Sequence, residues 1–197
     1  MAVSRGLLTY EAEGQEGGPY HSRKLHVPSS SSGLTIGRGY DMKEKKSSKI
    51  EFDLIDAGVD AATSALLGKA SGLSGSSAKR FISDNDLSDF EITMDAQEKL
   101  FESIYAELEK DVIRICNKAD CVKIYGAVNW NALDSKIRDA VVDLRFRGDY
   151  HSRSRKIIQK YISDNDLKQF TEKMLKRSNW AGVPEDRFNR RVAFLTS

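Results

Sequence analysis

Apolar side chains recur every three or four positions along most of the chain, which is the periodicity of amphipathic helices. The longest run of this kind extends from Thr93 to about Asn117, with Thr93 suited to an N-cap and Asp95 in the first turn. Its apolar positions are Leu100, Phe101, Ile104, Tyr105, Leu108, Val112 and Ile115. The pattern predicts one long helix over this run.

Shorter stretches repeat the same signal. A short helix around Leu7, Leu8 and Tyr10 is expected to stop before the glycines that follow it. "FDLIDAGVDAATSALLGKASG" predicts one helix that ends in a Gly/Ser-rich loop, and "NALDSKIRDAVVDLRF" predicts another. Two further helices are expected around 170–175 and, after Pro184, around 188–195.

One segment differs from the helical pattern. In "GLTIGRGYD", residues 33–41, three glycines alternate with β-branched and aromatic residues, which is typical of a tight β-hairpin. The sequence therefore predicts an α+β fold that is mainly helical, with a small β-containing N-terminal lobe followed by a helical body.

Composition narrows the class of protein. The chain has 197 residues, of which 30% are charged and 40% hydrophobic, as in globular domains. A net charge of +2 does not indicate nucleic-acid binding. No stretch approaches the ~18 apolar residues of a membrane span, and the N-terminus lacks the pattern of a Sec signal. We therefore expect no membrane span and no nucleic-acid partner.

Metal chemistry finds little support in the residue spacing. Cys116 and Cys121 have no second cysteine pair to complete a zinc site, so they are either two free thiols or a small-loop disulfide. His21, His26 and His151 also lack ligand spacing. We expect neither a metal nor a cofactor.

Carboxylates near the hairpin suggest a hydrolytic site. Glu11, Glu13 and Glu16 lie close together, and the next carboxylate is Asp41, within the hairpin. A glutamate at a helix end, facing Asp41 and Thr35, would supply the general acid and the second carboxylate that glycoside hydrolysis requires. Spacing alone also permits a surface glutamate and a threonine that merely favours a strand.

Several segments, in order along the chain, extend this pattern into a family resemblance. "YEAEG" followed by "GLTIGRGYD" resembles the active-site region of the phage-type (T-even) lysozymes, and more closely that of the pesticin-like muramidase domains of bacteriocins and toxins. "EITMDAQEKLF", "LDSKIRDAVVDLRFRG" and "MLKRSNWAGVPEDRFNRRVAFL" resemble that family's connecting helix, buried central helix and last helices. The resemblance covers most of the chain.

The resemblance implies a lysozyme-like fold in a single catalytic domain. It predicts an N-terminal lobe of about residues 1–92, a connecting helix over 93–117 and a helical C-terminal lobe over 118–197. Trp180 matches a tryptophan that packs the C-terminal lobe. The implied activity is that of a muramidase, which cleaves the β-1,4 bond between N-acetylmuramic acid and N-acetylglucosamine.

The same resemblance assigns roles to individual residues. Glu13 would be the general acid, Thr35 would position the attacking water, and Asp41 would be the second carboxylate. The phage enzymes place that carboxylate before the threonine, where this chain has the acid-free "HVPSSSSG". Glu11 is the rival for the acid, although the Glu-Gly pair favours Glu13.

Two arginines complete the predicted site. Arg147 would lie near the substrate cleft, and Arg187 would orient the catalytic acid through a charge-assisted hydrogen bond. Arginines on helices are also common as solvated residues, so a structural role stays open for both.

The biological setting follows from the same reading. The expected partner is bacterial peptidoglycan, in the periplasm or cell wall of target bacteria. We expect the protein to act as a monomer and to be delivered by a larger toxin, a secretion system or a holin. A toxin would also have an immunity protein. The alternatives are a phage endolysin with the same activity, or a lysozyme-like module that binds peptidoglycan with little turnover.

Overall fold

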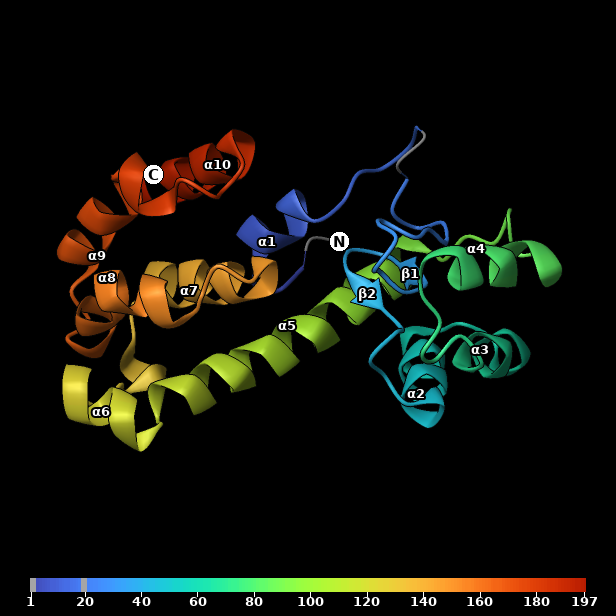
Figure 1. Ribbon diagram of the computed structural model, residues 1–197, viewed down its shortest axis with the longest axis horizontal. Coiled ribbons are helices and arrows are strands. Elements are labelled where there is room, and N and C mark those ends of the chain that lie inside the picture. The colour runs from blue at the N-terminus through green and yellow to red at the C-terminus, as the bar shows by residue number, and fades with distance from the viewer. Residues whose placement is uncertain (1–2, 19–20) are drawn as a thin grey trace. The chain divides into compact units, whose positions relative to one another are not determined.

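A computed structural model describes residues 3–18 and 21–197 (Figure 1). These residues form ten α-helices, two short 3-10 helices and a two-stranded antiparallel sheet. The elements are α1 (Leu7–Ala12), β1 (Thr35–Ile36), β2 (Tyr40–Asp41), α2 (Ser47–Ala57), α3 (Ala61–Gly68), α4 (Gly75–Asp84), α5 (Met94–Cys116), α6 (Ala119–Tyr125), η1 (Trp130–Ala132), α7 (Ser135–Arg147), α8 (Ser152–Ser163), α9 (Leu167–Leu175), η2 (Arg177–Trp180) and α10 (Glu185–Thr196). The prediction of a mainly helical α+β fold is confirmed.

The chain divides into two compact units. Unit 1 contains the described residues of 1–4 and 13–104, and unit 2 contains residues 5–12 and 105–197. Helix α5 is continuous and contributes residues to both units. The N-terminal helix α1 therefore belongs with the C-terminal half of the sequence, whereas the residues that follow it belong to unit 1.

Unit 1 is built around the β1–β2 hairpin. Thr35 pairs with Asp41 and Ile36 with Tyr40 in the antiparallel register. Four hairpin side chains are almost fully buried in one core with apolar residues of α2, α3, α4 and α5: Leu34, Ile36, Tyr40 and Met42. The Tyr40 hydroxyl donates a 2.8 Å hydrogen bond to Asp53 on α2, so the core also satisfies its buried polar atom.

Unit 2 is a helical assembly centred on α7. The amphipathic pattern predicted this helix, and it buries Ile137, Val141 and Leu144 while Asp134 caps its N-terminus. Helix α1 packs against α7 and α10, and α8 packs against α9. Trp180 is buried as expected, and its indole N–H donates to the Lys173 carbonyl oxygen at 3.1 Å.

The prediction of one helix over residues 52–72 is wrong. Helix α2 ends at Ala57, and Gly58 adopts the left-handed conformation with φ of 100°. Asp60 then caps α3 by accepting a hydrogen bond from the Thr63 N–H. A glycine that ends a helix, followed by an N-cap aspartate, divides an apolar periodicity that reads as continuous.

Three helices were not predicted from the sequence, namely α4, α6 and α8. The signal for α8 lies in Ile157, Ile158, Tyr161 and Ile162, whose spacing marks one face of a helix. Its N-cap is His151, an unusual cap whose ring nitrogen accepts from the Arg153 N–H. Cys116 and Cys121 are both buried free thiols, which decides between the two alternatives left open for them. No helix within residues 3–18 and 21–197 is long and apolar enough to span a membrane.

Candidate functional site

The hairpin brings Thr35 and Asp41 together. They are direct partners in the antiparallel register, and partners in such a register carry their side chains on the same face. Leu34 and Ile36 point to the opposite face, into the core. The predicted hairpin therefore carries both polar side chains on one face.

Both polar side chains bond to main-chain groups that flank the two strands. The two Asp41 carboxylate oxygens accept from the Gly33 N–H at 3.0 Å and the Lys43 N–H at 2.8 Å. The buried Thr35 hydroxyl donates to the Gly33 carbonyl oxygen at 3.2 Å. A Cβ atom at Gly33 would lie 2.2 Å from an Asp41 oxygen, so only glycine fits there. Thr35 and Asp41 thus shape the hairpin, whatever chemistry they perform.

The structure separates the two candidate acids. Glu13 follows directly after α1 ends at Ala12, is partly buried and belongs to unit 1 with Thr35 and Asp41. Glu11 is exposed, belongs to unit 2 and lines a groove of about 300 Å³ between α1 and α10. Glu13 is therefore the glutamate that shares a compact unit with the hairpin.

Arg38 connects the hairpin to the residue after Glu13. It lies in the turn between β1 and β2, is 7% exposed, and donates from Nη1 to the Gly14 carbonyl oxygen at 3.0 Å. A Cβ atom at Gly14 would lie 2.7 Å from the Arg38 Cγ and 3.1 Å from Ser22. The Glu-Gly pair in the sequence thus has a physical reason: the arginine side chain crosses the position that a larger residue would fill.

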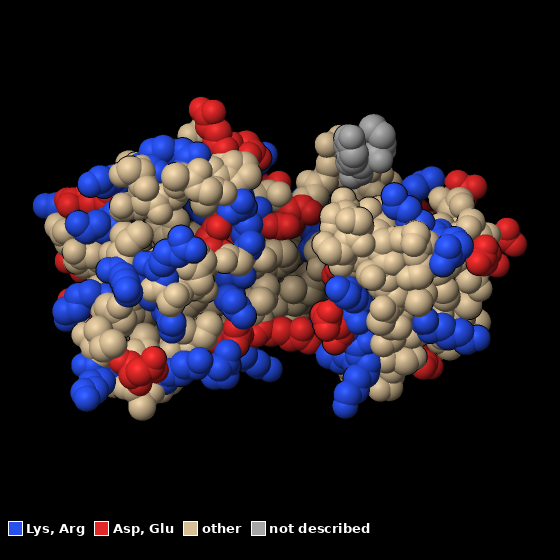
Figure 2. All heavy atoms as spheres, in the orientation of Figure 1, with Lys and Arg blue, Asp and Glu red and all other residues tan. Residues whose placement is uncertain are grey.

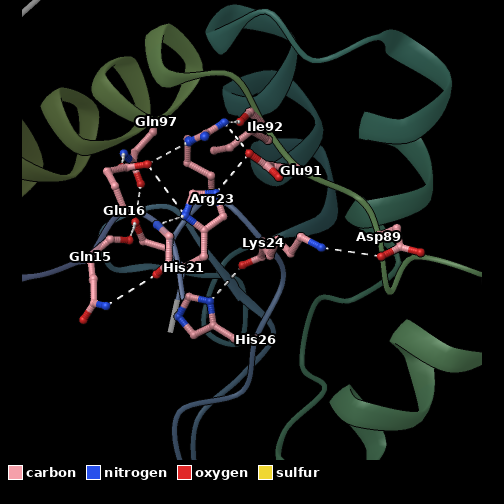
Figure 3. A network of polar contacts seen from close by, with 12 residues as sticks. Gln15, Glu16, His21, Arg23, Lys24, His26, Asp89, Glu91, Ile92 and Gln97 are labelled. Atoms are coloured by element: carbon pink, nitrogen blue, oxygen red, sulfur yellow. Dashed lines mark hydrogen bonds and ion pairs between the residues drawn. The ribbon is translucent and has the colours of Figure 1, made fainter. Parts of the chain in front are cut away.

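A polar network continues from Arg38 along the segment after Glu13 (Figure 3). Glu16 Oε1 accepts from Gln97 Nε2 on α5 at 2.6 Å, and Oε2 accepts from Arg23 Nε at 2.9 Å. Burial alone would raise the pKa of Glu16, but the hydrogen bonds from Gln97 and Arg23 and the charges of Arg23 and Arg38 hold it below its usual value. Glu16 is therefore held as a carboxylate that anchors this segment.

Glu91 forms the second acidic centre of the network. His21 Nδ1 accepts from the Gly17 N–H at 2.7 Å, so the ring proton lies on Nε2, which contacts Glu91 at 3.0 Å. Arg23 Nη1 lies 2.5 Å from the same carboxylate. These contacts, with the His21 hydrogen bond as the largest cause, lower the pKa of Glu91. Figure 3 shows Arg23 between Glu16 and Glu91, where it joins both carboxylates.

The sequence pattern predicted neither this network nor a role for Arg38. A signal was present for Arg38, because a long charged side chain between two glycines is not needed for the turn itself. Glu91 is far from Glu16 and Arg23 in the sequence, and no periodic pattern relates the three residues. In the part of the chain that the structure describes, no group of three His, Cys, Asp or Glu side chains could hold a metal ion.

The predicted arginines of unit 2 have structural partners. Arg187 Nη2 donates to Asp143 at 2.6 Å, and Asp143 has no exposed surface. Arg147 donates to Asp149 and, at 3.2 Å, to the Gly182 carbonyl oxygen. The predicted contact of Arg187 with the catalytic acid, and substrate binding by Arg147, stay predictions.

Asp143 is the centre of a buried ionic cluster that the sequence pattern did not predict either. Its carboxylate accepts from Arg187, from Arg191 Nε at 2.7 Å and from the Thr9 hydroxyl on α1 at 3.0 Å. Arg191 also donates to Asp149 at 2.9 Å. The cluster joins α1, α7 and α10 within unit 2.

Comparison with known proteins assigns the chain to a family. The chain belongs to the family described as "Domain of unknown function (DUF8812)", which covers residues 6–192. A search of curated proteins finds no match.

Proposed function

We propose that the chain is a peptidoglycan hydrolase, an N-acetylmuramidase that cleaves the β-1,4 bond between N-acetylmuramic acid and N-acetylglucosamine. The observation that carries the proposal is the pairing of Thr35 with Asp41 on a hairpin whose Arg38 bonds the main chain next to Glu13. Three residue types suited to glycoside hydrolysis thereby belong to one unit. The sequence resemblance to phage-type lysozymes and pesticin-like muramidases points to the same reaction.

The roles follow from the contacts of each residue. Glu13 protonates the departing glycosidic oxygen. Asp41, whose orientation is held by the Gly33 and Lys43 N–H groups, carries the second negative charge, and the Thr35 hydroxyl positions the water. Direct attack by that water inverts the anomeric centre and requires Glu13 and Asp41 carboxyls about 6.5–9.5 Å apart, whereas a covalent route requires about 5–5.5 Å.

One observation favours a second candidate, a module that binds peptidoglycan with little turnover. Both Asp41 oxygens and the Thr35 hydroxyl already bond to the main chain around Gly33. A side chain that shapes the hairpin can be retained for that purpose alone. The two candidates differ in products and not in fold, so product analysis separates them.

The test is digestion of purified peptidoglycan, followed by mass spectrometry of the released muropeptides. The wild-type chain should produce new reducing-end muramic acid. Glu13→Gln should lower the rate by at least about 100-fold, because it removes the proton donor but keeps the shape of the side chain. Glu11→Gln, the matched control from unit 2, should retain the wild-type rate.

Each outcome has a distinct meaning. Near-normal activity of Glu13→Gln with loss in Glu11→Gln would transfer the acid role to Glu11. Cut stem peptides without new reducing ends would indicate an amidase, and an absence of products with retained binding to peptidoglycan would establish the binding module.

The proposed setting is the periplasm or cell wall of target bacteria. The resemblance to pesticin-like domains favours the bacteriolytic domain of an antibacterial toxin, which would have an immunity protein as partner. A phage endolysin with the same activity is the alternative setting.

A further inference from the structure

Positive charge is concentrated in one segment of unit 2. Residues 152–177 contain eight basic and three acidic residues, a net charge of +5, whereas the whole chain carries only +2. This segment forms α8, α9 and the start of η2. Figure 2 shows Lys and Arg side chains outnumbering Asp and Glu over this part of the surface. The surplus is therefore local and not a property of the chain as a whole.

A pocket of about 270 Å³ lies within this basic segment. Its lining residues are Lys156, Ile157, Tyr161, Lys173, Lys176 and Asn179. The three lysines come from different places, one on α8, one on α9 and one at the residue between α9 and η2. The lining contains no acidic residue, so three cations converge on one hollow without a counter-charge.

Two other charged residues of the segment already have specific contacts. Lys160, on the same helix as Lys156, pairs with Asp164 at 2.6 Å. Asp166 caps α9 by accepting from the Gln169 N–H at 3.0 Å. Across residues 3–18 and 21–197, by contrast, no carboxylate forms an ion pair with a lysine of the pocket. Bringing like charges together costs free energy, which a bound anion would offset.

The remaining lining residues suit a sugar ring next to that anion. Tyr161 presents a partly buried aromatic ring beside Ile157, and the Lys173 ammonium lies 5.7 Å from the centre of this ring. The Asn179 amide donates to the Lys173 carbonyl oxygen at 3.0 Å, which holds its side chain at the edge of the pocket. An aromatic ring with a fixed amide offers a stacking face and a hydrogen-bonding group.

We propose that this pocket is a binding site for a phosphorylated monosaccharide. A phosphate monoester carries nearly two negative charges, which matches three convergent lysines better than a single carboxylate does. Lysine binds phosphate as a point charge and does not need the planar geometry of arginine. The volume of about 270 Å³ lies just below the roughly 300–1,000 Å³ of ordinary ligand pockets, which suits one sugar phosphate and not a folded peptide. The site is independent of the proposed hydrolytic activity.

The experiment uses the full chain labelled with ¹⁵N and follows amide shifts by NMR at low salt. The probe is N-acetylglucosamine 1-phosphate, compared with N-acetylglucosamine and with inorganic phosphate. The sugar phosphate should give saturable shifts confined to residues 156–161 and 173–179, and should bind at least fivefold more tightly than either comparison compound. Raising the salt concentration to about 0.2 M should weaken binding, because salt screens exposed charges.

Matched triple variants separate a built site from general charge. K156A/K173A/K176A should reduce the affinity at least tenfold. K79A/K110A/K123A removes three exposed lysines outside the pocket and should stay within twofold of wild type. Equal losses in the two variants, shifts spread over the whole surface, or equal affinity for N-acetylglucosamine or inorganic phosphate would each overturn the proposal. Circular dichroism of both variants verifies that they are folded.

Discussion

Each unit holds a segment from the first 25 residues by a carboxylate that also contacts arginines, but the two carboxylates differ in burial. In unit 2, Asp143 has no exposed surface and holds α1 through Thr9, with Arg187 and Arg191 completing its contacts. In unit 1, the side chain of Glu16 is 37% exposed, and the Glu16–Arg23 contact lies at the surface of the segment after Glu13. The same chemistry is structural in one unit and open to solvent in the other.

The difference in burial between the two carboxylates determines what each network can do. A buried ion pair has lost its hydration, so removing one partner leaves an uncompensated charge and the fold suffers. A solvent-exposed pair contributes little stability, because water replaces a lost partner. The unit 1 network can therefore hold the segment after Glu13 while water still reaches its carboxylates.

The largest expected effect is on the buried cluster. Asp143→Ala leaves two buried guanidinium groups without their shared carboxylate and should cost about 3–5 kcal/mol of unfolding free energy. Thermal unfolding should show a midpoint lowered by about 6–20 °C. Asp111→Ala removes a more exposed carboxylate, paired with Arg114 and Arg145, and should cost only about 1 kcal/mol. Equal losses of unfolding free energy in the two variants would contradict the argument that burial of the carboxylate determines the effect.

The next effect concerns the contact between Gly14 and Arg38. Gly14→Ala places a Cβ atom 2.7 Å from the Arg38 Cγ and should cost about 1–3 kcal/mol. Hydrogen exchange should increase in residues 14–18, and the proposed hydrolysis should slow because Glu13 loses its fixed neighbour. Gly182→Ala, where no atom lies within 4 Å of the added Cβ, is the control and should be nearly neutral. A Gly14→Ala variant as stable as the control would refute the steric argument.

A smaller effect should appear in the pH dependence of unit 1. Because contacts hold the folded-state pKa of Glu16 below 4.5, ionised Glu16 stabilises the fold above about pH 4.5, and this stability is lost as the pH falls through the folded-state pKa. Glu16→Gln should cost less than about 1 kcal/mol at pH 7, since the group is exposed. Urea unfolding from pH 7 to pH 3 should show a flatter profile for the variant. Glu44→Gln, at a side chain that is 88% exposed, should follow wild type.

The smallest effect has the opposite sign and lies in unit 2. Burial raises the pKa of Asp139, and the hydrogen bond of 2.8 Å from the Tyr105 hydroxyl only partly opposes this. The stability that protonation provides is complete below pH 3.8 and is lost as the pH rises through the folded-state pKa. Asp139→Asn keeps an acceptor for Tyr105 and should raise the midpoint of thermal unfolding at pH 7 by about 2 °C, with no gain below pH 3.8. Asp139→Ala, which removes the acceptor, should be less stable than Asp139→Asn. If Asp139→Asn raised the midpoint of thermal unfolding as much at pH 3 as at pH 7, the ionisation of Asp139 would not be the cause of the gain.

Local structure was predictable where neighbouring residues determine it. The long helix over 93–117 appears as Met94–Cys116, and the helix in "NALDSKIRDAVVDLRF" appears as Ser135–Arg147. The boundary between α2 and α3 is marked in the sequence by Gly58. The apolar periodicity continues through this glycine, so the pattern predicted a single helix. Periodicity reports which face is apolar, and it does not report where the helix axis changes direction.

The sequence by itself determined the helical periodicity and the glycine-rich hairpin that carries Thr35 and Asp41, because both depend on residues close together in the chain. Only the tertiary structure decided that Arg38 bonds Gly14, that Asp143 collects two arginines, and that three lysines line one pocket. These arrangements bring together residues from different elements of the chain. Their energies depend on burial and distance, which composition and spacing do not specify.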